Sequence, residues 1–220
     1  MSRNQPPDVL VIGLGRFGST LALELMRRGH QVHAVDSDPE RVEGYADHLT
    51  STTRGDCTNP DTLAAVGAAS FAHVVVAIGS DIEASILVTA ELAEIGVDNI
   101  WAKAISDTQA RILRRVGAKK VIRPEEDTGI RVAHTLTGNI DTYFELEEGF
   151  AVVQTGVPTA LAGQSLERRM VRTRYGVTVV AWKPPDGPYR NATPETVLAA
   201  GHKLLVAGHP QDIDAFAMLD

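Results

Sequence analysis

The chain has 220 residues, of which 44% are hydrophobic and 22% are charged. This length is sufficient for two small domains, and the composition is typical of globular proteins. The formal net charge of −7 argues against general affinity for nucleic acid or for an anionic membrane surface. Cys57 is the only cysteine, so no disulfide can form within the chain, and a reducing compartment is expected.

Residues 1–7 are polar and contain two prolines, and we expect this N-terminus to be flexible. No apolar run in the sequence has the length of a membrane span, and the N-terminus has no apolar signal-peptide core. We therefore expect a cytoplasmic protein, which can still dock on a membrane protein.

The first predicted elements are a strand, a glycine-rich turn and a helix. Val9–Ile12 is an apolar run typical of a buried strand, and Gly13, Gly15 and Gly18 follow it. In this pattern the first glycine allows a tight turn, the second lets a phosphate approach the backbone, and the third lets the helix pack closely on the strand. The N-terminus of that helix offers unpaired N–H groups and a positive dipole to an anion.

Arg16 follows the second glycine, at the start of this helix. Helix N–H groups commonly satisfy a pyrophosphate alone, so a guanidinium here indicates additional negative charge, such as a terminal phosphate. The alternative interpretation is a solvent-exposed arginine at a helix start.

Asp36 follows the second predicted strand, Gln31–Val35, and lies twenty-three residues after Gly13. A carboxylate at about this spacing accepts a hydrogen bond from a ribose hydroxyl in dinucleotide-binding domains. Glycines, strand and acid together predict a site for an adenosine nucleotide, which includes the neighbouring residues Phe17 and Ser37. The alternative is a tight turn in an α/β domain that binds no nucleotide.

Strands and helices continue to alternate up to residue 139. This order predicts a Rossmann-like doubly wound α/β fold over residues 8–139, with helices on both faces of a parallel sheet. The further predicted strands are Leu49–Thr53, Val74–Ile78, Ile100–Ala104 and Lys120–Ile122, and the predicted helices are Phe17–Arg28, Pro39–Ala46, Pro60–Val66, Ile82–Ile95, Asp107–Val116 and Glu125–Thr137.

Residues after the third and fourth strands are candidates for the same site, because the carboxyl ends of parallel strands share one edge of the sheet. Asp56 can accept a hydrogen bond from the exocyclic amine of adenine, or it can instead close a local turn. Cys57 is expected to pack against the base, since the sequence offers no partner that would activate its thiol. Ile78 and Gly79 close the fourth strand near the expected change in strand order.

Two charged residues further along the chain complete the predicted site. Lys103 ends the fifth strand, where it can reach a phosphate or remain a solvated charge. Glu125 and Glu126 follow Pro124 at a helix start, where acids interact favourably with the helix dipole. A second interpretation makes Glu125 a ligand of a hard divalent cation, Mg²⁺ or Ca²⁺, beside the phosphates.

The pattern changes after Gly138, and residues 140–220 predict a smaller, mostly β unit with a boundary near residues 138–142. Its predicted strands are Tyr143–Leu146, Ala151–Thr155, Val177–Trp182 and Leu204–Ala207, and its short helices are Ser165–Arg169 and Asp212–Met218. Four arginines, including Arg169 and Arg172, crowd one segment. Such runs are usually solvated faces, and a second anion pocket is the alternative.

Eight segments of the sequence share the order and spacing of one known family: Val11–Gly18, Ala34–Asp36, Val75–Gly79, Asn99–Ala104, Gly117–Ala118, Pro124–Glu125, Arg172–Gly176 and Gly201–Ala207. They resemble the regulator-of-K⁺-conductance (RCK) domain, and most closely the cytosolic KtrA-like gating subunits of Ktr/Trk potassium uptake systems. The last two segments resemble the small α+β RCK-C (TrkA-C) domain of that family, and the others its nucleotide-binding RCK-N domain.

The resemblance implies a regulatory subunit without catalytic activity. It implies dimers, commonly assembled as an eight-subunit ring, at the inner face of the membrane beneath a K⁺ channel or transporter. ATP or ADP, or NAD(H) as in Trk relatives, is expected at the glycine loop. By position, the resemblance assigns the nucleotide and cation roles to Gly13, Gly15, Arg16, Asp36, Lys103 and Glu125. Some members bind cyclic di-AMP in the C-terminal domain, and Arg169 and Arg172 lie near the corresponding segment.

Two other functions are compatible with the fold, since fold alone does not fix function. An NAD-dependent oxidoreductase needs an acid–base set, and the residues after the nucleotide domain supply none that is evident. An NAD-sensing transcriptional regulator needs a DNA-binding element, and the sequence has neither a helix-turn-helix pattern nor a basic face. We therefore expect a regulator of K⁺ transport that binds no nucleic acid.

Overall fold

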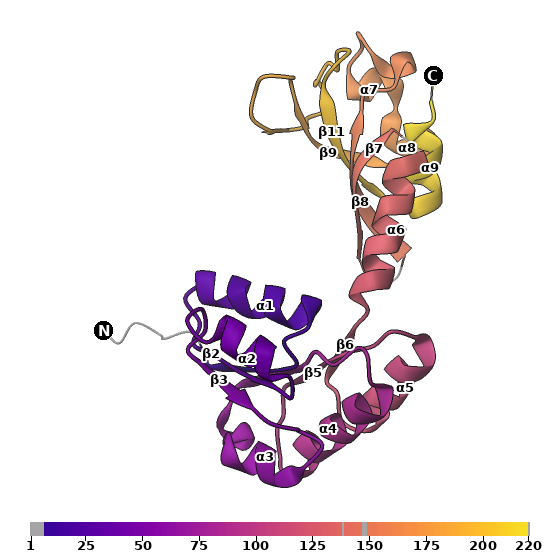
Figure 1. Cartoon of the computed structure of the whole chain (residues 1–220). Helices are drawn as coiled ribbons and strands as arrows, with labels where there is room; N and C mark the ends of the chain where they lie inside the picture. Colours follow the sequence, from indigo (N-terminus) through magenta and orange to yellow (C-terminus); the bar gives the residue numbers. More distant parts are fainter. Residues whose placement is uncertain (1–6, 138, 147–148, 220) are drawn as a thin grey trace, which may run out of the picture. The chain divides into compact units, whose positions relative to one another are not determined.

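The computed structural model describes residues 7–137, 139–146 and 149–219. The N-terminus that was expected to be flexible lies outside these ranges, apart from Pro7. The chain divides into two compact units, one ending at Glu126 and the other beginning at Asp127 (Figure 1). None of the helices in the described ranges is long and apolar enough to cross a membrane.

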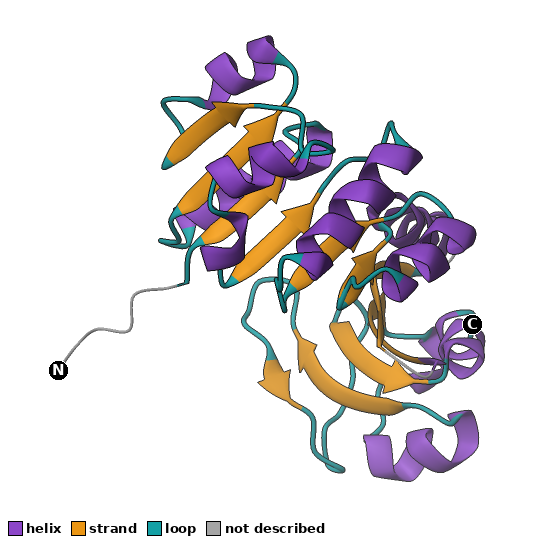
Figure 2. Cartoon of the chain, turned by 90° about the horizontal axis from the view of Figure 1, so that it is seen from below, coloured by secondary structure: helices purple, strands orange, loops and turns teal. Residues whose placement is uncertain are grey.

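The first unit is built on a six-stranded parallel sheet with strand order β3-β2-β1-β4-β5-β6. This order and the helices that connect the strands confirm the predicted doubly wound α/β fold (Figures 1 and 2). The strands are β1 (Val9–Ile12), β2 (Val32–Asp36), β3 (Ser51–Arg54), β4 (His73–Val76), β5 (Ile100–Lys103) and β6 (Lys120–Ile122). The helices are α1 (Arg16–Arg27), α2 (Pro39–Tyr45), α3 (Pro60–Ala65), η1 (Ala68–Ser70), α4 (Ile82–Glu94), α5 (Asp107–Arg115) and α6 (Pro124–Thr137), whose first turn alone belongs to this unit.

Each face of this sheet has its own hydrophobic core. One core joins side chains of β1, β4 and β5, such as Leu10, Val74 and Ile100, to α3, α4 and α5. The other joins Val11 and Ala34 to α1 and α2. Because both faces are covered, the central strands β1 and β4 are nearly continuous apolar runs, which is why they were recognisable in the sequence, whereas the edge strand β3 is polar.

The register of β1 decides where the site lies. Ile12 pairs with Val35 on one side and with Val76 on the other. The residues that follow these three strands therefore emerge at the same edge of the sheet. The strand order changes direction at β1, and ligands bind at such switch points in open α/β sheets.

The second unit is a five-stranded antiparallel sheet with order β10-β9-β11-β8-β7, and α8 and α9 pack on it. It confirms the predicted small α+β domain. Its strands are β7 (Ile140–Leu146), β8 (Phe150–Gly156), β9 (Thr178–Lys183), β10 (Arg190–Asn191) and β11 (Lys203–Gly208). Its helices after α6 are η3 (Thr159–Leu161), α7 (Leu166–Arg169), α8 (Val171–Tyr175) and α9 (Pro210–Ala217).

Three elements of this unit, η3, α8 and β10, were not predicted. The arginine-rich segment Val171–Tyr175 forms α8, which Met170 separates from α7 by adopting a left-handed conformation with φ of +48°. Strand β10 has only two residues, and it exists because Arg190 and Asn191 pair with Trp182 and Ala181 of β9. The pairing of β10 with β9 is a contact with another segment, which local patterns do not reveal.

The two compact units divide within α6, earlier in the chain than the boundary expected near residues 138–142. Charge pairs hold the first turn of this helix to the first unit, where Glu125 contacts Lys103 and Glu126 contacts Arg123. Further along the helix, His134 stacks on Tyr143 of β7 with ring centroids 3.8 Å apart. The continuous helix therefore has contacts with one unit at its start and with the other near its end.

Candidate functional site

The glycine loop after β1 has the geometry that the sequence predicted. Gly13 adopts a left-handed conformation with φ of +98°, and a Cβ atom there would lie 3.3 Å from the backbone of Ala77 and Ile78. A Cβ atom on Gly18 would overlap the carbonyl oxygen of Gly13. By contrast, a Cβ atom on Gly15 would have no neighbour within 4 Å. The middle glycine thus faces open space, as close approach of a ligand to the backbone requires.

The N-terminus of α1 is available to an anion. Gly15 is its N-cap residue, and no side chain accepts a hydrogen bond from the first backbone N–H groups. The first turn also contains no acidic residue. The other long helix of this unit, α4, has instead the Asp81 carboxylate as its cap. The uncapped N–H groups and the dipole of α1 therefore favour a phosphate beside Gly15.

Asp36 is buried at the end of β2, with 6% of its surface exposed. Its Oδ2 atom accepts a hydrogen bond of 2.6 Å from the backbone N–H of Leu14, and its Oδ1 atom accepts one of 2.9 Å from Asp38. The Arg41 guanidinium lies 3.5 Å from the same Oδ2 atom. A carboxylate has about four lone-pair positions, so Asp36 can hold the glycine loop and still accept a ribose hydroxyl.

Sequence reasoning missed the contribution of Leu14 and Arg41 to this arrangement. The backbone N–H of Leu14 leaves no trace in the sequence, because any residue at that position supplies it. Arg41 also approaches Asp38, the N-cap of α2, at 3.3 Å. The sequence did contain one signal for Arg41, because this arginine lies three residues after the N-cap aspartate Asp38.

The opposite side of the edge brings Lys103 and Glu125 together. Lys103 Nζ donates a hydrogen bond of 2.6 Å to Glu125 Oε1, although the lysine side chain is only 10% exposed. The same ammonium lies 5.9 Å from the centre of the Phe17 ring. It also packs against Gly79, where a Cβ atom would lie 3.0 Å from Nζ. Phe17, Gly79, Lys103 and Glu125 therefore form one continuous surface beside the glycine loop.

Charge on this surface is partly balanced. The hydrogen bond from Lys103 lowers the pKa of Glu125, and the Arg16 guanidinium adds a smaller effect in the same direction. Arg16 itself is exposed at the first position of α1. Because two cationic side chains act on one carboxylate, the surface keeps a positive excess that suits phosphate.

Asp56 and Cys57 have more local roles. Asp56 Oδ1 accepts hydrogen bonds from the N–H and the hydroxyl of Thr58, and these bonds lower its pKa. The turn interpretation of Asp56 is therefore confirmed, and the residue is exposed. Cys57 is 4% exposed, and burial, reinforced by the charges of Asp56 and Asp36, raises the pKa of its thiol to about 12. This thiol is a core group.

The remaining predicted residues of this edge are also accounted for. Ser37 is exposed directly after Asp36. Strand β4 ends at Val76 rather than at the predicted Ile78, and the backbone N–H of Ala77 still donates a hydrogen bond of 2.7 Å to the carbonyl of Ile12. Ile78 lies against Gly13 in the turn that follows. In the described residues, no group of three or more His, Cys, Asp or Glu side chains could hold a metal ion, so Glu125 is a single carboxylate.

Arg169 and Arg172 belong to the second unit, on α7 and α8 respectively. The Nε atom of Arg169 is buried and has no hydrogen-bond partner in the described residues, whereas Arg172 is exposed. These arginines flank Met170, the residue that separates the two short helices.

Two family models match this chain. The TrkA-N domain matches residues 9–124, and the TrkA-C domain matches residues 152–219. The chain belongs to the TrkA family of RCK-domain proteins. Within this family, Ktr system potassium uptake protein A of Bacillus subtilis strain 168 is 35% identical over 217 residues, which cover 98% of each chain. The protein of the same name from Vibrio alginolyticus is 38% identical over 205 residues, or 92% of each chain.

Solved structures place this TrkA-family chain among RCK folds. The GsuK channel bound to NAD is similar over the whole chain with a TM-score of 0.67 and 17% identity, and this chain spans 40% of its length. The Shewanella denitrificans Kef C-terminal domain in its AMP-bound form is 28% identical with a TM-score of 0.52, over 60% of this chain and 82% of that one. The RCK resemblance and the Rossmann-like fold are both confirmed.

Proposed function

We propose that this TrkA-family protein is the cytosolic regulatory subunit of a Ktr- or Trk-type K⁺ channel or transporter, and that it has no catalytic activity. The observation that carries the proposal is the sheet edge where an open Gly15, the uncapped α1 helix and the buried Asp36 carboxylate lie together. Relatives that match almost the whole chain are named as components of a potassium uptake system.

The ligand of this edge is an adenine nucleotide, ATP or ADP, with NAD(H) as the alternative. Asp36 accepts the ribose hydroxyls, and Gly13, Gly15 and Gly18 let the diphosphate reach the N-terminus of α1. Ser37, Asp56 and Ile78 surround the adenosine. The AMP-bound state of a relative with 28% identity supports this class of ligand. The negative charge of Asp36 disfavours NADP, whose 2′-phosphate would meet a like charge.

Terminal phosphates extend toward Arg16 and Lys103 at the other side of the edge. Glu125 Oε1 accepts the hydrogen bond from Lys103, and 60% of the glutamate side chain remains exposed. A bound divalent cation, Mg²⁺ or Ca²⁺, would neutralise charge between Glu125 and the phosphates. Because one carboxylate is insufficient to hold such an ion, the phosphates and the equivalent residue of a second copy would complete the oxygen set.

Gating follows if the nucleotide binds two conformations of an assembly with unequal affinity. The assembly is a dimer and, by family resemblance, an octameric ring at the inner face of the membrane, with residues 8–139 and 140–220 as its two domains. Cyclic di-AMP is a candidate second ligand near Arg169 and Arg172. ATP and ADP would then favour different arrangements of the ring, and the membrane subunit would respond to that difference.

The experiment that tests this proposal is reconstitution with a Ktr-type membrane subunit in K⁺-loaded vesicles. We expect K⁺ flux to change when ATP replaces ADP, only when this protein is present. Light scattering should give an assembly larger than a monomer. Identical flux with either nucleotide and with NAD(H) would contradict the proposal, and substrate-dependent oxidation of NADH would favour the oxidoreductase alternative.

A further inference from the structure

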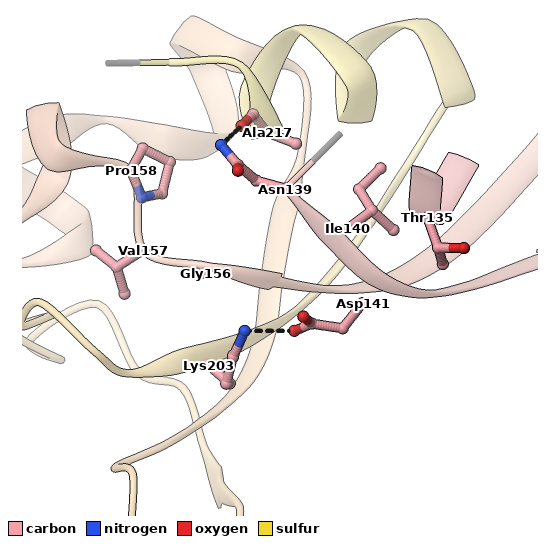
Figure 3. A pocket seen from close by; sticks show the side chains of 9 residues that line it. All are labelled: Thr135, Asn139, Ile140, Asp141, Gly156, Val157, Pro158, Lys203 and Ala217. Carbon is pink, nitrogen blue, oxygen red and sulfur yellow. Dashed lines mark hydrogen bonds and ion pairs between the residues drawn. The ribbon is translucent and has the colours of Figure 1, made fainter. Parts of the chain in front are cut away.

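The second unit contains a cavity of about 550 Å³ that the proposed function does not use. Its lining comes from β7, the end of β8, the start of β11, and the ends of α6 and α9 (Figure 3). Neither Arg169 nor Arg172 lines it. The volume lies within the range of roughly 300–1,000 Å³ that is usual for small-molecule sites.

Gly156 lines the cavity without a side chain. Gly156 of β8 pairs with Lys203 of β11, and a Cβ atom on Gly156 would have no neighbour within 4 Å. Asp141 of β7 and Lys203 of β11 lie on either side of β8 in the sheet, and they form an ion pair with Lys203 Nζ 2.6 Å from Asp141 Oδ2. Both side chains are 39% exposed, so this ion pair forms one charged wall that a ligand can reach (Figure 3).

The carboxylate of this pair has an unused oxygen. Asp141 Oδ2 accepts from both Lys203 and Gln154, whereas Oδ1 accepts no hydrogen bond from any described residue. Burial alone would raise the pKa of Asp141, but the hydrogen bonds from Lys203 and Gln154 outweigh that effect and lower it. The cavity wall therefore presents one anionic acceptor beside one ammonium donor.

Asn139 faces this pair from the opposite wall of the cavity (Figure 3). The Nδ2 atom of Asn139 donates a hydrogen bond of 3.0 Å to the backbone carbonyl of Ala217. The backbone carbonyl of Asn139 accepts one of 2.7 Å from the buried Thr155 hydroxyl. Because the amide nitrogen is engaged, the Oδ1 atom remains as a second acceptor, free of hydrogen bonds from described residues. Apolar side chains of Ile140, Val157 and Pro158 complete the walls.

These groups define the chemistry of the ligand. A phosphate or another anion would approach Asp141 as well as Lys203, and a cation would approach Lys203 as well as Asp141, so a ligand with one type of charge meets repulsion. We infer that the cavity is a site for a small zwitterion with an apolar side chain, the class of neutral α-amino acids. The ammonium group is bound by Asp141 Oδ1 and Asn139 Oδ1, the carboxylate by Lys203, and the side chain by Val157 and Pro158.

The test is equilibrium binding of L-leucine and L-phenylalanine to the full chain, measured by calorimetry without nucleotide. We expect saturable binding of at least one, and binding at least about tenfold weaker for isoamylamine and isocaproate, which each carry only one of the two charges of leucine. No saturable binding of either amino acid up to about 20 mM would overturn the inference. Binding of isocaproate as tight as that of leucine would also overturn the inference, because it would show that the site recognises only an anion.

Two variants locate the binding within the cavity. Gly156→Leu fills the open space, and Asp141→Asn removes the anionic acceptor while keeping its shape. Each should weaken binding at least about tenfold while thermal unfolding stays cooperative. Gly44→Leu is the matched control, because a Cβ atom on that glycine also has no neighbour within 4 Å and Gly44 lies on α2 of the first unit. Unchanged leucine binding by Gly156→Leu would place the binding elsewhere and reject this site.

Discussion

The carboxylate of Asp36 accepts a hydrogen bond of 2.6 Å from the backbone N–H of Leu14, the residue between the first two glycines of the loop. This bond links the end of β2 to the turn after β1, two segments that are 22 residues apart. The residue proposed to bind the ribose therefore also holds the loop proposed to bind the phosphates. Binding and loop geometry are coupled through one side chain.

Replacing Asp36 should impair nucleotide binding first. We expect Asp36→Ala to weaken adenine nucleotide binding by about 1.5–3 kcal/mol, since a charged hydrogen bond to the ribose and the fixed loop are both lost. Calorimetry measures this, with Asp36→Asn as an uncharged variant that retains one acceptor oxygen. Glu40→Ala, which removes an exposed acid of α2, is the control. If Asp36→Ala binds the nucleotide with unchanged affinity, Asp36 does not bind the ribose.

The glycines of the loop should separate folding from binding. In Gly18→Ala the new methyl group would overlap the Gly13 carbonyl, and we expect a loss of stability of about 1–3 kcal/mol or more. In Gly15→Ala the methyl group meets open space, so stability should change by less than about 1 kcal/mol, while nucleotide affinity falls. Urea unfolding and calorimetry on both variants measure the two effects. Equal stability losses would mean that the loop geometry described above is incorrect.

Arg16 should distinguish ATP from ADP. Its position at the first turn of α1, near enough to Glu125 to lower the pKa of that group, directs the guanidinium toward phosphates beyond the diphosphate. Arg16→Ala is expected to weaken ATP binding more than ADP binding, by an additional 1 kcal/mol or so, about the contribution of one charge-assisted hydrogen bond. Arg27→Ala, at the other end of the same helix, controls for net charge. Equal losses for both nucleotides would show that Arg16 contacts only groups that they share.

Glu125 should couple cation and nucleotide binding. If it is a ligand of the cation, Mg²⁺ strengthens ATP binding at least about fivefold in the wild type, and Glu125→Gln removes this effect. Glu126→Gln is the matched control, because Glu126 begins the same helix but pairs with Arg123 instead. Titrations with ATP in the presence and absence of Mg²⁺ measure the coupling. If Mg²⁺ has the same effect on the wild type and on Glu125→Gln, Glu125 is not a ligand of the cation, and its role is limited to the hydrogen bond with Lys103 and the interaction with the helix dipole.

Cys57 should make stability fall in alkaline solution. Its pKa is about 12 in the folded protein and about 8.5 in an unfolded chain. The folded state thus favours the protonated thiol, so the free energy of unfolding is constant below the unfolded pKa and decreases above it by up to about 1.4 kcal/mol per pH unit. Tyr143, whose pKa is also raised to about 12, contributes only above about pH 10.

Urea unfolding of wild type and Cys57→Ala between about pH 8 and pH 10 isolates this effect. The difference in unfolding free energy between the two proteins should shrink as the pH rises. A difference that stays constant over this interval would show that the thiol titrates normally in the folded state.

Local patterns were sufficient for the sheet of the first unit. The buried run Val9–Ile12 forms a strand with the predicted bounds, because a strand covered on both faces is apolar throughout. Lys120–Ile122 also forms a strand with the predicted bounds, although Lys120 is exposed. The glycine positions and Asp36 were also identified from spacing, since turn geometry and strand length restrict both. Strand ends were less certain, as β4 shows, because the last pairing residue depends on its neighbouring strands.

The sequence by itself therefore determined the fold class and the family, because both depend on short segments whose geometry their own residues impose. Only the tertiary structure decided which charges meet. Lys103 pairs with Glu125 22 residues later, and Asp141 meets Lys203 because their strands flank β8 in the sheet. It also decided that the compact units divide within α6. These outcomes depend on how segments that are far apart in the sequence pack together. Strand register and burial decide which side chains become partners in such cases, and local spacing in the sequence does not.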